Sequence, residues 1–147
     1  MRKDTVMGRV TVDIEVANNV DDELAQRGQL SADKVRRLTL SALVDTGATM
    51  LVMPEDVIQR LGLRPMRTVN TRLGDGQVTP RTIYGSVKLT VLKRMMTVDV
   101  VGAPPGVPAL LGQIPLEGLD FVVDLANQRL IPNPESPDPE MALVYIL

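Results

Sequence analysis

The chain of 147 residues contains no histidine and no cysteine. A Ser-His-Asp triad needs an imidazole and a cysteine nucleophile needs a thiol, so both catalytic arrangements are excluded. A zinc site built from His and Cys and a disulfide framework are excluded for the same reason. Any catalysis by the side chains of this sequence must therefore rely on carboxylates.

Aromatic residues make up only 2% of the chain, and the net charge is −2. A nucleic-acid-binding domain would be expected to show a basic face and stacking rings, so no nucleic-acid partner is predicted. The first residues lead into an alternating pattern and not into a continuous apolar run, which predicts neither a signal peptide nor a membrane partner. The absence of cysteine also suits a reducing compartment, and we expect a cytoplasmic location.

Hydrophobic periodicity predicts one domain that is mostly β. Residues 8–16 and 38–44 alternate between apolar and polar side chains with a period of two, which is typical of half-buried strands. Further strands are predicted at 49–53, 69–73, 78–84, 86–92, 95–101, 121–123 and 129–131. The polar residues 18–37 are predicted to be a surface insertion with one short helical turn.

Two short helical segments are predicted. One begins at Pro54-Glu55-Asp56, where proline and two acids suit a helix N-terminus, and ends at Gly62. The other is a helical turn at 116–119. Between them, Gly74-Asp75-Gly76 separates two extended arms, which predicts a β-hairpin with a mobile tip. The Lys93-Arg94 pair is predicted to be a solvated turn.

The C-terminal residues have a different composition. Residues 132–140 contain four prolines, which exclude a helix or a central strand and predict an extended spacer. Residues 141–147 are apolar and are expected to be covered by something. We therefore expect a domain at 1–131, followed by a proline-rich spacer and an apolar tail at 132–147.

The sequence Asp45-Thr46-Gly47 follows the predicted strand 38–44 and places a carboxylate at the end of an apolar run. A carboxylate peptidase uses two Asp side chains that share one proton, so that one takes a proton from water while the other donates to the scissile carbonyl. The Asp-Thr-Gly triplet occurs once in this chain. Asp124, which also follows a predicted strand, fits an ordinary turn acid better than a second catalytic group.

The sequence resembles the retropepsin-like (retroviral-type) aspartic proteases, and in particular their small single-domain bacterial members. The resemblance rests on Leu-Val-Asp-Thr-Gly-Ala-Thr at 43–49, on the Gly74-Asp75-Gly76 hairpin and on Ala-Leu-Leu-Gly at 109–112. It implies a closed β-barrel with a flap hairpin and one or two short helices, active as a homodimer. It also implies a peptide or protein substrate and no cofactor or metal.

The resemblance assigns roles to single residues. Asp45 of each subunit would form the catalytic pair, Thr46 would hydrogen-bond across the two-fold axis, and Gly47 would allow a tight backbone beside the carboxylate. Ala48 and Thr49 would contact substrate, and so would Gly74, Asp75 and Gly76 at the flap. Asp75 departs from the family, whose flaps usually carry an apolar residue followed by glycines, because it puts a charge at the tip.

Two functions remain open at this stage. The first is an aspartic endopeptidase that hydrolyses peptide bonds through water held by an Asp45 pair across a homodimer axis. The alternative is a catalytically inactive dimeric peptide-binding module on the same fold. The tail 141–147 also allows three interpretations: a strand of the dimer interface, which we favour because exposed apolar edges aggregate, a ligand of the substrate groove, or a processing site.

Overall fold

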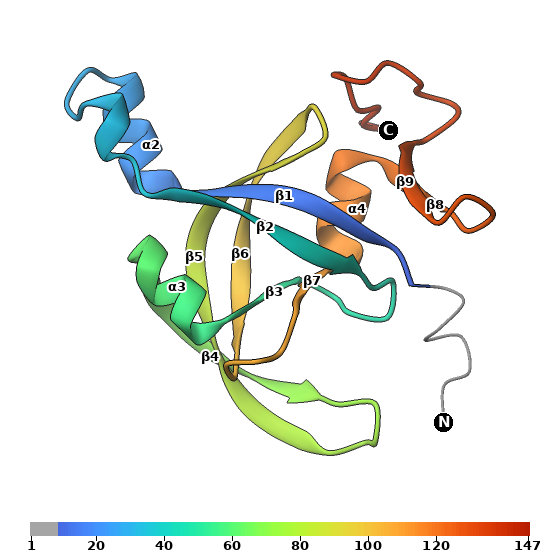
Figure 1. The fold of residues 1–147 in the computed structure, drawn as a ribbon, viewed down its shortest axis with the longest axis horizontal. Coiled ribbons are helices and arrows are strands. Elements are labelled where there is room, and N and C mark those ends of the chain that lie inside the picture. The colour runs from blue at the N-terminus through green and yellow to red at the C-terminus, as the bar shows by residue number, and fades with distance from the viewer. Residues whose placement is uncertain (1–8) are drawn as a thin grey trace.

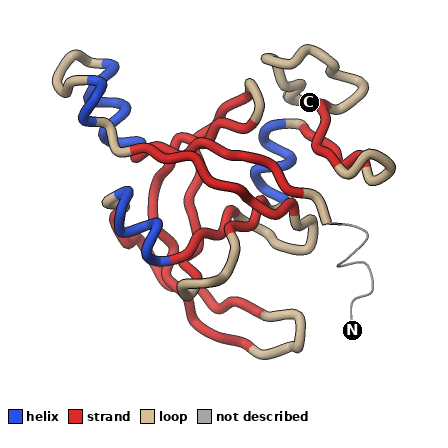
Figure 2. The backbone as a smooth tube through the Cα atoms, viewed as in Figure 1, coloured by secondary structure: helices blue, strands red, loops and turns tan. Residues whose placement is uncertain are grey.

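The structure is a computed structural model and describes residues 9–147. Strands dominate this range, and the helices lie at its periphery (Figure 2). The strands are β1 (Thr11–Asn18), β2 (Arg37–Val44), β3 (Leu51–Pro54), β4 (Arg64–Arg72), β5 (Val78–Val91), β6 (Arg94–Ala103), β7 (Ala109–Leu111), β8 (Phe121–Asp124) and β9 (Arg129–Pro132). The helices are α2 (Asn19–Gln26), the 3-10 helix η1 (Ala32–Lys34), α3 (Glu55–Leu61) and α4 (Gln113–Leu119).

Six strands close into a mixed barrel. They are hydrogen-bonded in the order β1-β2-β7-β3-β6-β5, and a pairing between β5 and β1 completes the ring (Figure 1). The β2–β7 and β3–β6 pairs are parallel. Strand β4 pairs with β5 outside the ring, and β8 and β9 form a separate hairpin. The predicted mostly β, closed barrel is therefore confirmed.

The barrel interior is filled by the apolar positions of the alternating strands. In β1, Ile14 and Val16 are fully buried while Asp13 and Glu15 are exposed. The helices α3 and α4 add Ile58, Leu61, Leu116 and Leu119 to the same core. The helices are therefore part of the core although they lie outside the sheet. Burial of each such Leu or Ile side chain contributes about 1.5–3 kcal/mol to the free energy of folding.

The predicted strands 78–84 and 86–92 are one continuous strand, β5. Its pairing with β6 shifts register between Tyr84 and Val87, where one extra residue is accommodated. A bulge of this kind bends a strand without ending it, which is why a sequence break at Gly85 does not separate two elements. The first half of β5 therefore forms the hairpin with β4, and its second half closes the barrel by pairing with β1.

The insertion 18–37 is more ordered than predicted. It forms the complete helix α2, so that the described residues contain three short α-helices where one or two were expected. Asn18 caps the helix through Asp21 N at 3.0 Å, and its Nδ2 donates to Leu61 O at 2.9 Å. Arg36 donates Nε and Nη2 to the two oxygens of Asp21 at 2.8 and 3.0 Å. These hydrogen bonds hold the pKa of the Asp21 carboxyl below its usual value.

Arg94 does not lie in a solvated turn. It is the first residue of β6, only 2% exposed, and its guanidinium stacks over Phe121 at 5.1 Å. Its Nη1 donates to Leu119 O and Asp120 O, both at 2.8 Å. Its Nη2 donates to the carbonyls of Ser136, Asp138 and Met141 at 2.8, 2.6 and 3.2 Å. The prediction is thus wrong for Arg94, which fastens the proline-rich segment to the domain.

Beyond that segment the chain is open to solvent. Val144 and Ile146 are 69% and 89% exposed, and the last bond that ties the tail to the domain runs from Leu143 N to Asp120 Oδ2 at 3.1 Å. None of the helices found in residues 9–147 is long and apolar enough to cross a membrane.

Candidate active site

Asp45 follows the last residue of β2, and parallel pairing with β7 fixes its position. Leu43 and Val44 lie opposite Leu110 and Leu111, and Asp45 N continues the ladder by donating to Leu111 O at 3.0 Å. Two neighbouring strands of the barrel therefore set the backbone that carries the carboxylate. The Asp45 side chain is half-buried.

The residues after Asp45 turn back toward it. Gly47 N donates to Asp45 Oδ1 at 2.9 Å, and Ala48 N donates to Asp45 O at 3.1 Å. A Cβ on residue 47 would lie 3.2 Å from Asp45 Oδ1, so a larger residue would crowd the carboxylate. One carboxylate oxygen is thus held by the backbone. The other, Oδ2, has no hydrogen-bond partner within the part of the chain that the structure describes.

A second contact locks the loop 45–50 against the start of α4. Gln113 N donates to Ala48 O and Ile114 N donates to Thr49 O, both at 2.8 Å. Gly112, the residue before Gln113, lies so close to the loop that a Cβ there would stand 2.3 Å from Met50 O and 2.7 Å from Ala48 O. Because side chains cannot enter that space, the Leu-Leu-Gly sequence brings two backbones into direct contact.

An apolar row extends from Asp45 across the barrel. Directly paired residues of neighbouring strands share one face of a sheet. The pairings that define the row link Leu43 to Leu110, Leu110 to Val52, Val52 to Val101 and Val101 to Ile83. Leu43, Val52 and Leu110 are half-buried, unlike Leu111 on the opposite face, which is fully buried in the core. Asp45 is two residues from Leu43 and so shares this face.

The hairpin of β4 and β5 reaches away from the barrel beside this row (Figure 1). Its tip is closed by Leu73 N donating to Gln77 O at 2.8 Å and by Gly76 N donating to Leu73 O at 2.9 Å. Asp75 Oδ1 accepts from Gln77 N at 2.9 Å. The Asp75 carboxylate is therefore part of the turn, although Asp75 is exposed like Gly74 and Gly76.

The structure gathers some of the candidate residues and separates others. Asp45, Gly47, Ala48 and Thr49 form one compact loop, with Thr46 exposed at its turn. Gly74, Asp75 and Gly76 lie on a different element, at the end of the hairpin.

The carboxylate of Asp124, in contrast, is hydrogen-bonded within its own turn. It accepts from Asn127 Nδ2 at 2.8 Å and from Arg129 Nε at 3.3 Å, which hold its pKa below the usual value.

The sequence alone did not reveal the apolar row that contains Leu43, Val52 and Leu110. Strand alternation carries the signal, since Leu43 and Val44 must face opposite sides of β2 and so must Leu110 and Leu111 of β7. Which side is the core follows only from the neighbouring strands. Of the Leu110-Leu111 pair, only Leu111 belongs to the core.

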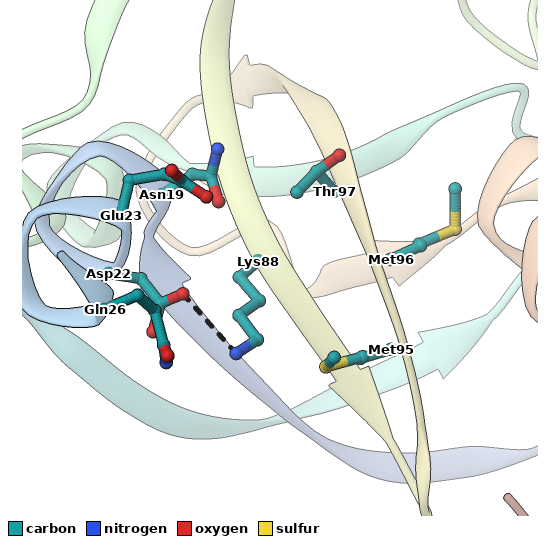
Figure 3. Close-up of a pocket in the computed structure, with 8 residues that line it drawn as sticks. All are labelled: Asn19, Asp22, Glu23, Gln26, Lys88, Met95, Met96 and Thr97. Atoms are coloured by element: carbon teal, nitrogen blue, oxygen red, sulfur yellow. Dashed lines mark hydrogen bonds and ion pairs between the residues drawn. The ribbon is translucent and has the colours of Figure 1, made fainter.

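A cavity of about 390 Å³ lies elsewhere, between α2 and the strands β5 and β6 (Figure 3). Four polar side chains of α2 line it on one side. Lys88, Met95, Met96 and Thr97 line the other, and Lys88 Nζ forms an ion pair with Asp22 Oδ2 at 3.4 Å. None of these residues belongs to the loop 45–50 or to the hairpin tip. The cavity is therefore separate from the carboxylate of Asp45.

Comparison with known proteins agrees with this arrangement. The model of the family described as gag-polyprotein putative aspartyl protease matches residues 34–117. That span begins at the end of η1, contains the loop around Asp45, the whole β4–β5 hairpin and Gly112, and ends within α4. A search among curated proteins finds no match. The chain belongs to the gag-polyprotein aspartyl protease family, which is retropepsin-like.

Proposed function

We propose that this protein is an aspartic endopeptidase that works as a homodimer. The observation that carries the proposal is the Asp45 carboxylate, which the backbone holds at the half-buried end of an apolar row whose far end, at Val101 and Ile83, is buried. An extended peptide needs such a floor for its side chains and a carboxylate beside its backbone. The β4–β5 hairpin, which stands next to the row, would close over the peptide as a flap.

The chemistry requires two carboxylates. Two copies of Asp45 that face each other across a two-fold axis would share one proton. The ionised carboxylate takes a proton from water, whose oxygen attacks the scissile carbonyl, while the protonated one donates to the carbonyl oxygen. Collapse of the tetrahedral intermediate then breaks the C–N bond, and the amine leaves with a proton. Water is consumed, and no further reactant is needed.

The exposed tail supports the dimer. Val144, Tyr145 and Ile146 are 69%, 74% and 89% exposed, and a contiguous apolar stretch of this kind usually marks a protein interface. We propose that it contributes to contact between the subunits, with Arg94 fixing the point from which it leaves the domain. Dimerisation would at the same time remove the stretch from water.

The decisive variant is Asp45→Asn, which keeps the shape of the side chain and an oxygen for Gly47 N. Loss of general acid–base chemistry is expected to lower the rate of peptide hydrolysis by about 10²- to 10⁴-fold, measured with a peptide library from acid to neutral pH. The matched control is Asp13→Asn, because Asp13 is exposed on β1 and should leave hydrolysis unchanged.

Mixing wild-type and Asp45→Asn chains tests the shared site. If each centre needs two intact chains, an equal mixture at constant total concentration keeps about a quarter of the activity, and if chains act singly it keeps about half. Full activity in Asp45→Asn would refute the proposal. A wild type that binds peptides but cleaves none would instead identify the inactive peptide-binding module.

A further inference from the structure

The β4–β5 hairpin has two unlike faces. Its register is continuous from Arg67↔Ile83 to Arg72↔Val78, so odd-numbered residues share one face and even-numbered residues the other. On the odd face, Val69, Thr71, Thr79 and Arg81 are half-buried, and only Arg67 at the base is exposed. On the even face, residues 68, 70, 72, 78 and 80 are exposed, and only Thr82 at the base is half-buried. The odd face is thus the covered face of the hairpin.

This covered face continues the apolar row that begins at Asp45. Ile83 belongs to both, because it pairs with Val101 in β6 and shares a face with Arg81 two residues before it. The row therefore runs from Leu43 along the outer face of the barrel to Ile83, and it continues along the hairpin. A peptide that lies on the row beside Asp45 would meet the odd face of the hairpin.

Arg81 is the half-buried charged residue of that face. It lies directly opposite Val69, with apolar Ile83 two positions away. Within residues 9–147 its side chain makes no hydrogen bond or ion pair, whereas Asp21 is paired with Arg36 and Asp124 with Arg129. A guanidinium is always charged and has five donors, so a half-buried one without an acceptor is suited to a ligand that supplies one.

The charge of the hairpin points to the sign of that ligand. The segment 64–83 contains Arg64, Arg67, Arg72 and Arg81 and a single acid, Asp75, although the whole chain has a net charge of −2. The one acid accepts from Gln77 N within the turn. A negatively charged peptide would therefore approach an oppositely charged hairpin on an otherwise acidic molecule.

We propose that Arg81 is a specificity-determining residue that binds a carboxylate side chain of the substrate, so that this protein acts on acidic peptides. Glu or Asp in the peptide accepts the paired N–H groups of Arg81, while neighbouring apolar side chains rest on Leu43, Val52 and Leu110. This inference rests on the proposed function, because it places the peptide between the floor and the hairpin. It adds the chemical class of the substrate.

The test separates binding from turnover by using the Asp45→Asn protein. Its affinity is measured by calorimetry for octapeptides with a central Leu-Leu pair, in which one flanking position at a time is Glu, Gln or Lys. At one position Glu should bind about tenfold or more tightly than Gln, as expected for hydrogen bonds to a charged group. Arg81→Met should abolish that difference, and Arg81→Glu should reverse it in favour of Lys.

The matched control is Arg72→Met, which removes an arginine from the exposed face of the same hairpin. It should keep the preference for Glu, because the Arg72 side chain reaches Gly76 O at 3.2 Å and not the covered face. The inference is overturned if no position distinguishes Glu from Gln, or if the preference survives in Arg81→Met. The reversal in Arg81→Glu guards against a general loss of folding, because an unfolded protein gains no affinity for Lys.

The outcomes also distinguish the two proposals. If the wild type cleaves the library but cleaves Glu and Gln peptides equally, Arg81 has no such role and the endopeptidase proposal stands. If the wild type cleaves nothing but Asp45→Asn binds Glu peptides through Arg81, the endopeptidase proposal fails and the recognition of acidic peptides stands.

Discussion

The loop 45–50 and the β4–β5 hairpin flank the same apolar row but are held in opposite ways. The loop is joined to β7 and α4 through Asp45 N, Ala48 O and Thr49 O, all of which bond to other elements of the barrel. In the hairpin, β4 pairs with β5 alone among the described strands, and the tip is closed by its own residues. The backbone of Asp45 is therefore held by other elements of the barrel, whereas the outer part of the hairpin is held only by its own pairing.

The largest effect is expected where the fixed side is disturbed, in Gly112→Ala. The new Cβ would meet backbone atoms of Met50 and Ala48, which cannot rotate away. We expect a loss of about 1–3 kcal/mol in the free energy of unfolding and, from displacement of Asp45, a loss of about 10²-fold in kcat/KM. Urea unfolding and peptide hydrolysis measure the two quantities.

Gly118→Ala is the matched control for that variant. Its Cβ would meet only Met96 Cε and Sδ, the far end of a flexible side chain, at 2.6 and 2.7 Å. Hydrolysis should remain near the wild-type rate. Equal losses of activity in both variants would show that the loop is no more tightly fixed than the rest of α4.

A smaller effect on hydrolysis, with a similar loss of stability, is expected at the base of the hairpin, in Tyr84→Phe. Tyr84 OH donates to Glu55 Oε1 at 2.6 Å and links β5 to α3. Loss of this hydrogen bond to a charged group should cost about 1–3 kcal/mol in the free energy of unfolding. Peptide hydrolysis should change less than in Gly112→Ala, since Tyr84 faces the core and not the apolar row.

The same bond predicts a pH dependence. The hydrogen bond to Glu55, together with burial, raises the pKa of the Tyr84 phenol above its ordinary value of 10.0. Its contribution to stability is therefore complete below about pH 10 and is lost as the pH rises through the higher pKa of the folded state. Urea unfolding on both sides of pH 10 should show the wild type approaching Tyr84→Phe. A constant difference would contradict this.

The smallest effect is expected at the hairpin tip, in Gly76→Ala. Gly76 has φ +88°, which an L-residue adopts at a cost of about 1 kcal/mol, although its Cβ would meet no atom within 4 Å. Gly74→Ala also has open space and no positive φ, so it should be neutral in thermal unfolding. If the two variants are equally stable, the backbone of the tip changes conformation at little cost in free energy. That result would strengthen the contrast between the fixed loop 45–50 and the less constrained hairpin.

Much of the barrel was predictable because strands with one wet side alternate with a period of two. The hairpin at Gly74-Asp75-Gly76 and the final β8–β9 hairpin follow from local turn chemistry and are found near their predicted positions. The bulge that joins both halves of β5 was not predictable in this way, because it depends on the register with β6. Local patterns fix elements, while pairing between distant strands fixes which residues share a face.

Buried charges were the main source of error. Asp21 and Arg94 look like surface residues in the sequence, because Asp21 lies in a polar stretch and Arg94 follows Lys93 at a predicted turn. They are buried because partners at a distance satisfy them: Arg36 for Asp21, and carbonyls up to 47 residues away for Arg94. For the candidate site, Asp45 was recognisable from its motif. The apolar row and the position of Arg81 could be identified only from the pairing between neighbouring strands.

The Arg94 clamp determines where the protein can be shortened. A chain cut after β9 would lose the Ser136, Asp138 and Met141 carbonyls and leave a permanent cation in an apolar site with three fewer acceptors. A shortened protein that keeps these hydrogen bonds therefore extends past Met141, to about Leu143, whose amide is the last one bonded to the domain. Fusion partners and affinity tags belong after the exposed tail, so that the residues proposed to contact the second subunit are kept.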